Sequence, residues 1–160
     1  MAKVIWMRLF LTLISAMVLS IGLVHADEKL KPMPDSHWKS ILSSDQFKIC
    51  REGGTERPGS GELLHHKGKG MYVCSSCGHE LFSSDTKFDS GSGWPSFWEV
   101  AKKGTVTLQS DDSMGMSRLE VRCAHCGAHL GHLFDDGPKP TGKRYCVNSA
   151  CLKFVPEKKK

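Results

Sequence analysis

Apolar residues recur at helical spacing near the start of the folded region, which predicts two short helices. The first is expected to be capped by Ser36, with its apolar side chains on one side (Trp38, Ile41 and Leu42). The second is expected to begin at Ser43, because Ser43 and Gln46 form a capping-box pattern, and to end at Gly53-Gly54. A loop rich in glycine and proline follows as far as Gly61.

From Met71 onward the pattern changes to short runs that are typical of strands separated by turns. The runs are Met71–Val73, Phe97–Val100, Thr105–Leu108 and Leu119–Val121. A further strand is predicted around Cys146, and Leu152–Val155 is expected to continue it or to pair with it. The chain is therefore predicted to be mainly β, with one or two small N-terminal helices.

The first 26 residues have the pattern of a signal peptide. Lys3 and Arg8 give a basic start, an uncharged run follows, and Val24-His25-Ala26 has the small residues of a cleavage site. We expect cleavage before Asp27 and export to the periplasm, with an uncleaved N-terminal membrane anchor or secretion as alternatives. Residues 27–35 are expected to form an irregular leader, residues 36–157 one domain and residues 158–160 a basic tail.

The formal net charge of +5 does not indicate a nucleic-acid partner. Much of the excess lies in the terminal lysines, which are typical of a solvated tail, and no basic stripe is interleaved with aromatic residues. We expect a monomer.

Four of the seven cysteines form two Cys-x-x-Cys pairs, each followed by glycine. This pattern predicts one closed structural zinc site with four sulfur ligands (Cys74, Cys77, Cys123 and Cys126). The pairs lie farther apart than the roughly 15–20 residues of a usual zinc ribbon, so a β insertion is expected between them. The alternative is a set of local or crossed disulfides in an oxidising compartment.

Of the other three cysteines, Cys146 has the surroundings of a reactive thiol. Arg144 and Asn148 lie two residues on either side, so in a strand all three side chains share one face. A neighbouring cation and amide donors stabilise a thiolate. The alternative is a buried cysteine that acts as a small apolar residue.

Two further segments carry chemistry that suits an activated thiol. The segment 90–98, Ser-Gly-Ser-Gly-Trp-Pro-Ser-Phe-Trp, places Trp94 on a flexible loop, and the segment 129–138 supplies two imidazoles, an aromatic ring and two carboxylates. Together with Cys146 they predict a site with an acid, an orienting carboxylate and an apolar wall.

These motifs, with Gly54-Thr55-Glu56-Arg57-Pro58 and both cysteine pairs, resemble the B-type methionine sulfoxide reductases from about Trp38 to Phe154. The resemblance implies two antiparallel β-sheets, a zinc site remote from catalysis and reduction of the R epimer of methionine sulfoxide. It implies that Cys146 is the nucleophile and forms a sulfenic acid, with reducing equivalents from a thioredoxin-like thiol donor. The other implied site residues are Trp94 and Phe134 around the substrate methyl group, His129 and His132 at the sulfoxide oxygen, and Asp136, Arg144 and Asn148 in the polar network around them.

The sequence departs from the family at Ser92, where many members carry a resolving cysteine. We expect Cys50 to resolve the sulfenic acid, with direct reduction by an external thiol as the second alternative. Cys151 ranks last, because on one continuous strand it lies roughly 16 Å from Cys146 and on the opposite face.

Two other classes of protein fit parts of this pattern. A zinc-stapled binding module would bind without turnover and would be insensitive to loss of Cys146. A secreted structural protein stapled by disulfides would contain no metal. The combination of Cys146, Trp94 and the histidine pair favours the enzyme.

Overall fold

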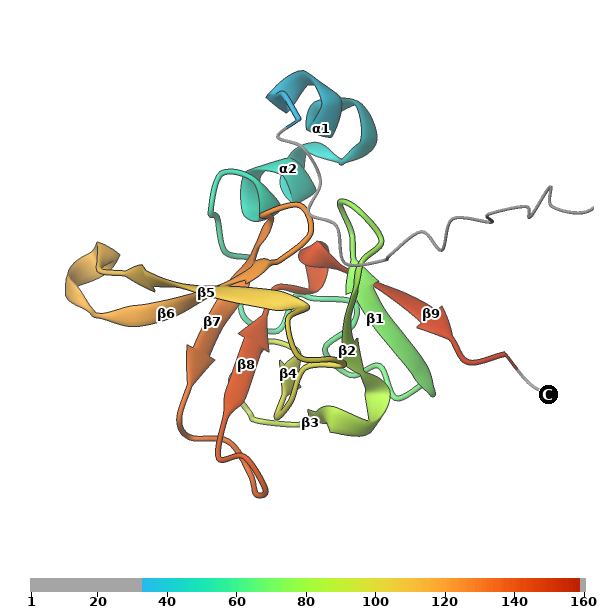
Figure 1. The fold of residues 1–160 in the computed structure, drawn as a ribbon, viewed down its shortest axis with the longest axis vertical. Helices are drawn as coiled ribbons and strands as arrows, with labels where there is room; N and C mark the ends of the chain where they lie inside the picture. Colours follow the sequence, from blue (N-terminus) through green and yellow to red (C-terminus); the bar gives the residue numbers. More distant parts are fainter. Residues whose placement is uncertain (1–32, 159–160) are drawn as a thin grey trace, which may run out of the picture.

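The computed structural model describes residues 33–158. The predicted signal peptide, most of the leader and the last two residues of the tail lie outside this range. Within it, the strands form two antiparallel sheets, with two small helices at one end (Figure 1). The predicted fold class, mainly β with two antiparallel sheets and small N-terminal helices, is confirmed.

The smaller sheet has the strand order β2-β1-β9. It consists of β1 (Gly70–Cys74), β2 (Glu80–Ser83) and β9 (Leu152–Pro156). The larger sheet has the order β3-β4-β8-β7-β6-β5. It consists of β3 (Lys87–Phe88), β4 (Ser96–Phe97), β5 (Val106–Asp111), β6 (Arg118–Cys123), β7 (His129–Phe134) and β8 (Arg144–Val147). Three short 3-10 turns connect strands: η1 (Ser84–Thr86), η2 (Ser113–Gly115) and η3 (Ser149–Cys151).

The helices are α1 (Asp35–Ile41) and α2 (Ser44–Cys50). Ser43 caps α2 as predicted, since its hydroxyl accepts from the Gln46 amide and its own amide donates to Gln46 Oε1. Ser36 does not cap α1, because Pro34 occupies the N-cap position without a side-chain bond. Among the described residues, no helix is long and apolar enough to cross a membrane.

The segment after Cys146 differs from the prediction. Residues 152–155 neither continue the Cys146 strand nor pair with it, because η3 follows β8 and turns the chain toward the other sheet. There β9 pairs with β1 along its whole length. Strand β7 was not predicted, since Gly131 and two histidines obscure its apolar alternation.

The core lies between the two sheets and is built around aromatic side chains. Tyr72 of β1, Phe82 of β2 and Phe97 of β4 are fully buried, and the last two rings stack with centroids 4.4 Å apart. Because successive side chains of a strand point to opposite faces, Ser96 faces away from this core and lies opposite Cys146 in β8. The short strand β4 therefore connects the core to the Cys146 side of the larger sheet.

Candidate active site and metal centre

Two turns of the same construction hold the paired cysteines. Cys74 and Cys77 lie at the turn between β1 and β2, and Cys123 and Cys126 lie at the turn between β6 and β7. In each turn the glycine after the second cysteine has a positive φ, 75° at Gly78 and 70° at Gly127. Its amide donates to the carbonyl oxygen of the first cysteine at 2.8 Å. The conformation that glycine permits thus curls each turn around its two sulfur atoms.

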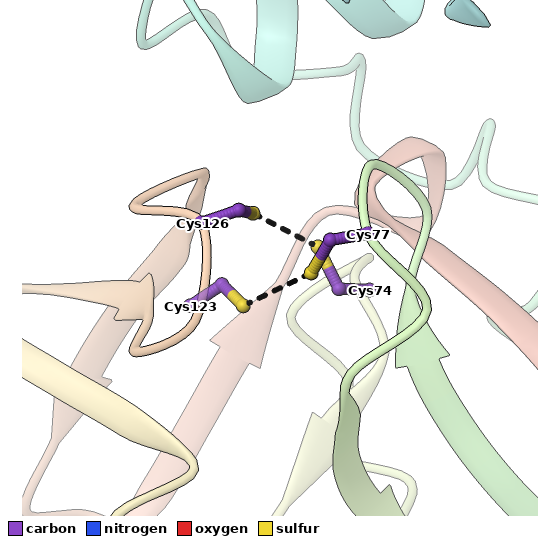
Figure 2. Close-up of side chains that lie close together, drawn as sticks. All are labelled: Cys74, Cys77, Cys123 and Cys126. Atoms are coloured by element: carbon purple, nitrogen blue, oxygen red, sulfur yellow. Dashed lines mark hydrogen bonds between the residues drawn. The ribbon is translucent and has the colours of Figure 1, made fainter. Parts of the chain in front are cut away.

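The four sulfur atoms face one another between the two turns (Figure 2). The Sγ atoms of Cys74 and Cys126 are 3.7 Å apart, as are those of Cys77 and Cys123, and all four lie within 4.8 Å of one another. Zinc–sulfur bonds of about 2.3 Å in a tetrahedron place the sulfur atoms about 3.8 Å apart. The cluster fits a closed structural zinc site, and none of these four cysteines forms a disulfide in this structure.

The helices pack directly on this cluster. Arg51 donates to the carbonyl oxygen of Cys126 at 3.1 Å, and its guanidinium lies 4.5 Å from the centre of the buried Trp38 ring. The apolar side chains of the helices also contact Cys126. A metal ion held here therefore joins the two sheets and anchors the helices to them.

The structure corrects the prediction for the remaining cysteines. Cys50 and Cys151 form a disulfide with a Cα–Cα distance of 5.6 Å, and both are fully buried. The prediction assumed that Cys151 continues the Cys146 strand, but η3 turns it toward the end of α2. In this structure neither residue offers a free thiol that could resolve a sulfenic acid on Cys146.

A row of polar side chains crosses the larger sheet at Cys146. Cys146 pairs with Ser96 of β4 on one side and with His132 of β7 on the other. His132 in turn pairs with Glu120 of β6. Directly opposed residues of antiparallel strands share one face, so these side chains are neighbours. Cys123 lies three positions beyond Glu120 and on the core side of β6, so the metal cluster does not belong to this row.

Three serine hydroxyls extend the surroundings of the thiol. Ser92 Oγ lies 3.7 Å from Cys146 Sγ. Ser90 Oγ lies 2.8 Å from both Ser92 Oγ and Ser96 Oγ. Ser92, which in the sequence only marks the position of a missing cysteine, thus contacts the predicted nucleophile in the structure.

Burial raises the pKa of the Cys146 thiol above its usual range. The Ser92 hydroxyl, the Arg144 cation and the Ser96 hydroxyl act in the opposite direction, because each stabilises the thiolate. The Arg144 cation thus favours the thiolate, but desolvation outweighs this effect in the free protein.

Replacing Arg144 by alanine should slow alkylation of Cys146 by iodoacetamide several-fold near neutral pH. Iodoacetamide reacts with the thiolate, so the alkylation rate increases with pH as Cys146 loses its proton. Because the pKa of Cys146 is raised, this increase occurs at higher pH than for an ordinary thiol. Loss of the cation should displace this profile farther toward high pH. The pH profile of alkylation in Arg144→Lys should lie closer to that of the wild type, because lysine keeps the positive charge. Mass spectrometry of the Cys146 peptide measures the rate, and identical profiles for all three proteins would contradict the role of Arg144.

Each histidine of the site, on β7, is held by a carboxylate from another strand of the larger sheet, Glu120 from the neighbouring β6 and Asp111 from β5 beyond it. His129 Nδ1 lies 2.7 Å from Glu120 Oε1, and His132 Nε2 lies 2.7 Å from Asp111 Oδ2. The two rings meet edge to face, with centroids 5.6 Å apart. No sequence pattern pointed to these carboxylates, since Glu120 lies within a predicted strand and Asp111 is the first of two acidic residues that follow another. Carboxylates in this position fix the orientation and tautomer of an imidazole.

Burial lowers the pKa of His129, against the opposing effect of the Glu120 carboxylate. A neutral His129 that donates from Nδ1 to Glu120 leaves the lone pair of Nε2 available. Nε2 is buried and has no hydrogen-bond partner in the described part of the chain. This atom can therefore accept a hydrogen bond or a proton from a group that enters the site.

Asp136 contacts Arg144, another member of the predicted polar network. Its two carboxylate oxygens accept from Arg144 at 2.7 and 2.9 Å, and this hydrogen bonding lowers the pKa of Asp136. The Arg144 guanidinium also lies 4.4 Å from the centre of the Phe134 ring. Phe134 and Asp136 together fix the cation that acts on Cys146.

The other predicted site residues reach the region from separate segments. Trp94 Nε1 donates to the main-chain oxygen of Glu56 at 3.1 Å. Asn148 is buried, and its side chain donates to the carbonyl oxygen of Leu130 at 3.0 Å. A cavity of about 550 Å³ adjoins the site, and its lining includes Ser92, Asp136 and Arg144 but neither Trp94 nor Phe134.

Comparison with known proteins adds to this geometry. Residues 42–156 match the SelR domain family. The chain is 55% identical over 123 residues to the peptide methionine sulfoxide reductase MsrB of Methanosarcina mazei, covering 77% of this chain and 88% of that protein. It is also 55% identical to the MsrB proteins of Leptospira interrogans and Pseudomonas aeruginosa strain PAO1, covering 77% of this chain and 94% and 93% of those proteins. The chain therefore belongs to the SelR-domain family, the B-type methionine sulfoxide reductases.

Proposed function

We propose that this protein reduces the R epimer of methionine sulfoxide in oxidised proteins, and so repairs oxidative damage. The observation that carries the proposal is the place of Cys146, which lies beside Ser92 and opposite His132 on one sheet face. Relatives of the same family that are named peptide methionine sulfoxide reductases support the reaction class. The R epimer and the thiol mechanism are our extension to this chain.

In the proposed reaction the Cys146 thiolate attacks the sulfur of the sulfoxide. A sulfur–sulfur bond forms while the sulfoxide oxygen takes up one proton. The oxygen then passes to Cys146 as the sulfur–sulfur bond breaks and the thioether leaves. The net change converts one thiol and one sulfoxide into a sulfenic acid and methionine. His129 and His132 are proposed to position or protonate the oxygen, since imidazole suits proton transfer near neutral pH. His129 would first take up a proton at Nε2, which has no partner among the described residues.

Trp94 and Phe134 are proposed to form the apolar wall for the substrate methyl group. Asn148, Arg144 and Asp136 are proposed to complete the polar surroundings of the thiol. We also propose zinc as the ion of the four-cysteine cluster, because an all-thiolate tetrahedral donor set is typical of structural zinc. Bound zinc would hold the two turns together and is assigned no chemical step.

The sulfenic acid is proposed to be reduced directly by an external dithiol of the thioredoxin class. Two donor thiols are oxidised to a disulfide, Cys146 returns to the thiol and one water is released. The Cys50–Cys151 disulfide supports this route over internal resolution, because it occupies both other cysteines outside the metal cluster.

Replacing Ser92 by cysteine is expected to create an internal resolving thiol, because Ser92 Oγ lies within 3.7 Å of Cys146 Sγ. After one turnover without reductant, the variant should carry a disulfide between positions 92 and 146. The wild-type chain should instead carry a sulfenic acid that dimedone traps. Mass spectrometry of unreduced peptides distinguishes these products, and Ser92→Ala serves as the control that cannot cross-link. An active Ser92→Cys variant without the cross-link would argue against this site geometry.

We propose export to the periplasm after removal of the first 26 residues. The Cys50–Cys151 disulfide supports an oxidising compartment, where disulfides persist. N-terminal sequencing of the protein from fractionated cells tests this: a start at Asp27 in the periplasmic fraction is expected. An intact Met1 terminus in a membrane fraction would favour the anchored alternative.

The reaction is tested with the metal-loaded chain from Asp27, dithiothreitol and the separate R and S epimers of a blocked methionine sulfoxide. Turnover of the R epimer alone is expected. Turnover of the S epimer alone would overturn the proposed stereochemistry. Absence of turnover with either epimer, in a folded and metal-loaded protein, would favour a binding module.

A further inference from the structure

Glu56 joins three parts of the candidate site that are far apart in the sequence. It lies on the loop between α2 and β1, and its main-chain oxygen accepts from Trp94 Nε1 at 3.1 Å. Its main-chain amide donates to Asn148 Oδ1, also at 3.1 Å. Its carboxylate accepts from the main-chain amides of Ser149 and Ala150. One residue thus contacts the indole and the segment that directly follows Cys146.

The carboxylate contacts are well matched in charge and geometry. Its two oxygens each receive one amide, Oε1 from Ser149 and Oε2 from Ala150. These amides belong to η3 (Ser149–Cys151), whose first N–H groups have no partners within the turn. A hydrogen bond to a charged acceptor contributes roughly twice as much as one between neutral groups. The two contacts therefore fix the loop against the chain segment that begins at Cys146.

Close packing leaves this part of the loop little freedom. Leu63 donates its amide to Ser149 Oγ at 2.9 Å, and Gly59 donates its amide to the Gly93 oxygen at 2.8 Å. A Cβ atom added at Gly61 would lie 2.5 Å from Ser149 Cβ and 2.9 Å from Glu56 Oε1. Beyond Glu56, the loop therefore contacts the Trp94 loop through Gly59 and η3 through Leu63.

The disulfide anchors the start of the same loop. Cys50 is the last residue of α2, and its partner Cys151 directly follows the two amides that the Glu56 carboxylate binds. The covalent bond therefore restrains the loop at one point and the carboxylate restrains it at a second. Only the second point lies at the residue that contacts the Trp94 indole.

We propose that Glu56 is a positioning residue that fixes the distance between the Trp94 indole and Cys146. It holds the indole through its main-chain oxygen and holds the Cys146 segment through its carboxylate and amide. This inference rests on the proposed function, in which Trp94 receives the substrate methyl group. Loss of the carboxylate should let the indole move relative to the thiol and weaken substrate binding more than the reactivity of the thiol.

The test compares Glu56→Ala and Glu56→Gln with Glu62→Ala, which removes a charge from an exposed position on the same loop. In Glu56→Ala, KM for the methyl sulfoxide substrate should rise on the order of tenfold, since small displacements of positioning groups have effects of this size or larger. The rate of Cys146 alkylation by iodoacetamide should stay near the wild-type value. The KM of Glu56→Gln should lie between those of the wild type and Glu56→Ala. The glutamine keeps one acceptor oxygen but places an NH₂ group against a main-chain amide donor. Glu62→Ala should match the wild type.

A spectroscopic measurement separates positioning from general stability. The indole N–H resonance of Trp94, assigned with Trp94→Phe, should exchange faster with solvent in Glu56→Ala, well below the unfolding temperature. Trp38 is the internal control, and its indole exchange should not change. If Glu56→Ala only lowers the unfolding temperature and leaves KM and Trp94 exchange unchanged, the inference is wrong. If the wild-type chain lacks turnover, the proposed function fails, and Trp94 exchange alone still decides whether Glu56 fixes the indole.

Discussion

In the Cys146→Ser variant, the rate of sulfoxide reduction should fall by at least about three orders of magnitude. The variant should keep its fold and its metal. The hydroxyl that replaces the thiol fits the same position beside Ser92, so packing changes little. A serine hydroxyl is far less ionised than a thiol near neutral pH, and it cannot form a sulfenic acid. The variant should also fail to react with dimedone after exposure to substrate.

The measurement is consumption of the R epimer with dithiothreitol, together with metal content and the thermal unfolding temperature. The double variant Cys50→Ser/Cys151→Ser is a suitable control, since it removes two other sulfur atoms but keeps Cys146. This control should retain most of the activity measured with dithiothreitol. Full activity in Cys146→Ser would refute the thiol mechanism, whereas loss of metal or fold in that variant would show that it cannot test the mechanism and that Cys146→Ala is needed.

Removal of one metal-cluster cysteine should unfold the domain. Apparent binding free energies of structural zinc in small domains are about 10 kcal/mol or more, comparable to the whole stability of a domain of this size. Cys126→Ser should be especially damaging, because Cys126 contacts both the core and the buried apolar side chains of the two helices. Its carbonyl oxygen also accepts a hydrogen bond from Arg51. The variant should lose the metal and the near-ultraviolet circular dichroism of a packed core.

One metal ion per chain is expected in the wild-type protein, and a strong chelator should unfold it at temperatures where it is otherwise stable. Lys158→Ala, a change at an exposed position after β9, is the control for the effect of substitution itself. A metal-free Cys126→Ser protein with the wild-type unfolding temperature would show that the cluster does not stabilise the fold. A purified wild-type chain without metal and without free thiols at the four positions would support the disulfide alternative.

Sequence spacing predicted the role of the four metal-cluster cysteines but not the pairing of Cys50 with Cys151. Each Cys-x-x-Cys-Gly turn is specified by five consecutive residues, so the pattern predicted the ligands and the positive φ of the glycines was a local consequence. The pair Cys50 and Cys151 has a sequence separation of 101, and no local pattern relates them. Their disulfide depends on the turn η3, which directs Cys151 toward the end of α2.

The histidines give a second comparison. The sequence predicted that His129 and His132 belong to a site with Cys146, and pairing of β7 with β8 places His132 directly opposite Cys146. The family resemblance implied that Asp136 belongs to their network. The structure assigns the orienting carboxylates to Glu120 and Asp111, which reach the histidines through the pairing of β6 with β7 and β5 with β6.

What the sequence determined by itself was local: the α2 cap at Ser43, the two metal-binding turns, and the identity of Cys146 as the thiol beside Arg144. These features depend on residues within a few positions of one another, where backbone geometry leaves few alternatives. The tertiary structure alone decided which carboxylate holds each histidine, which cysteines pair, and that Glu56 links Trp94 to the Cys146 segment. Those contacts depend on strand register, including the irregularity between Val121 and Arg122, and a shift of one residue moves a side chain to the other face of the sheet.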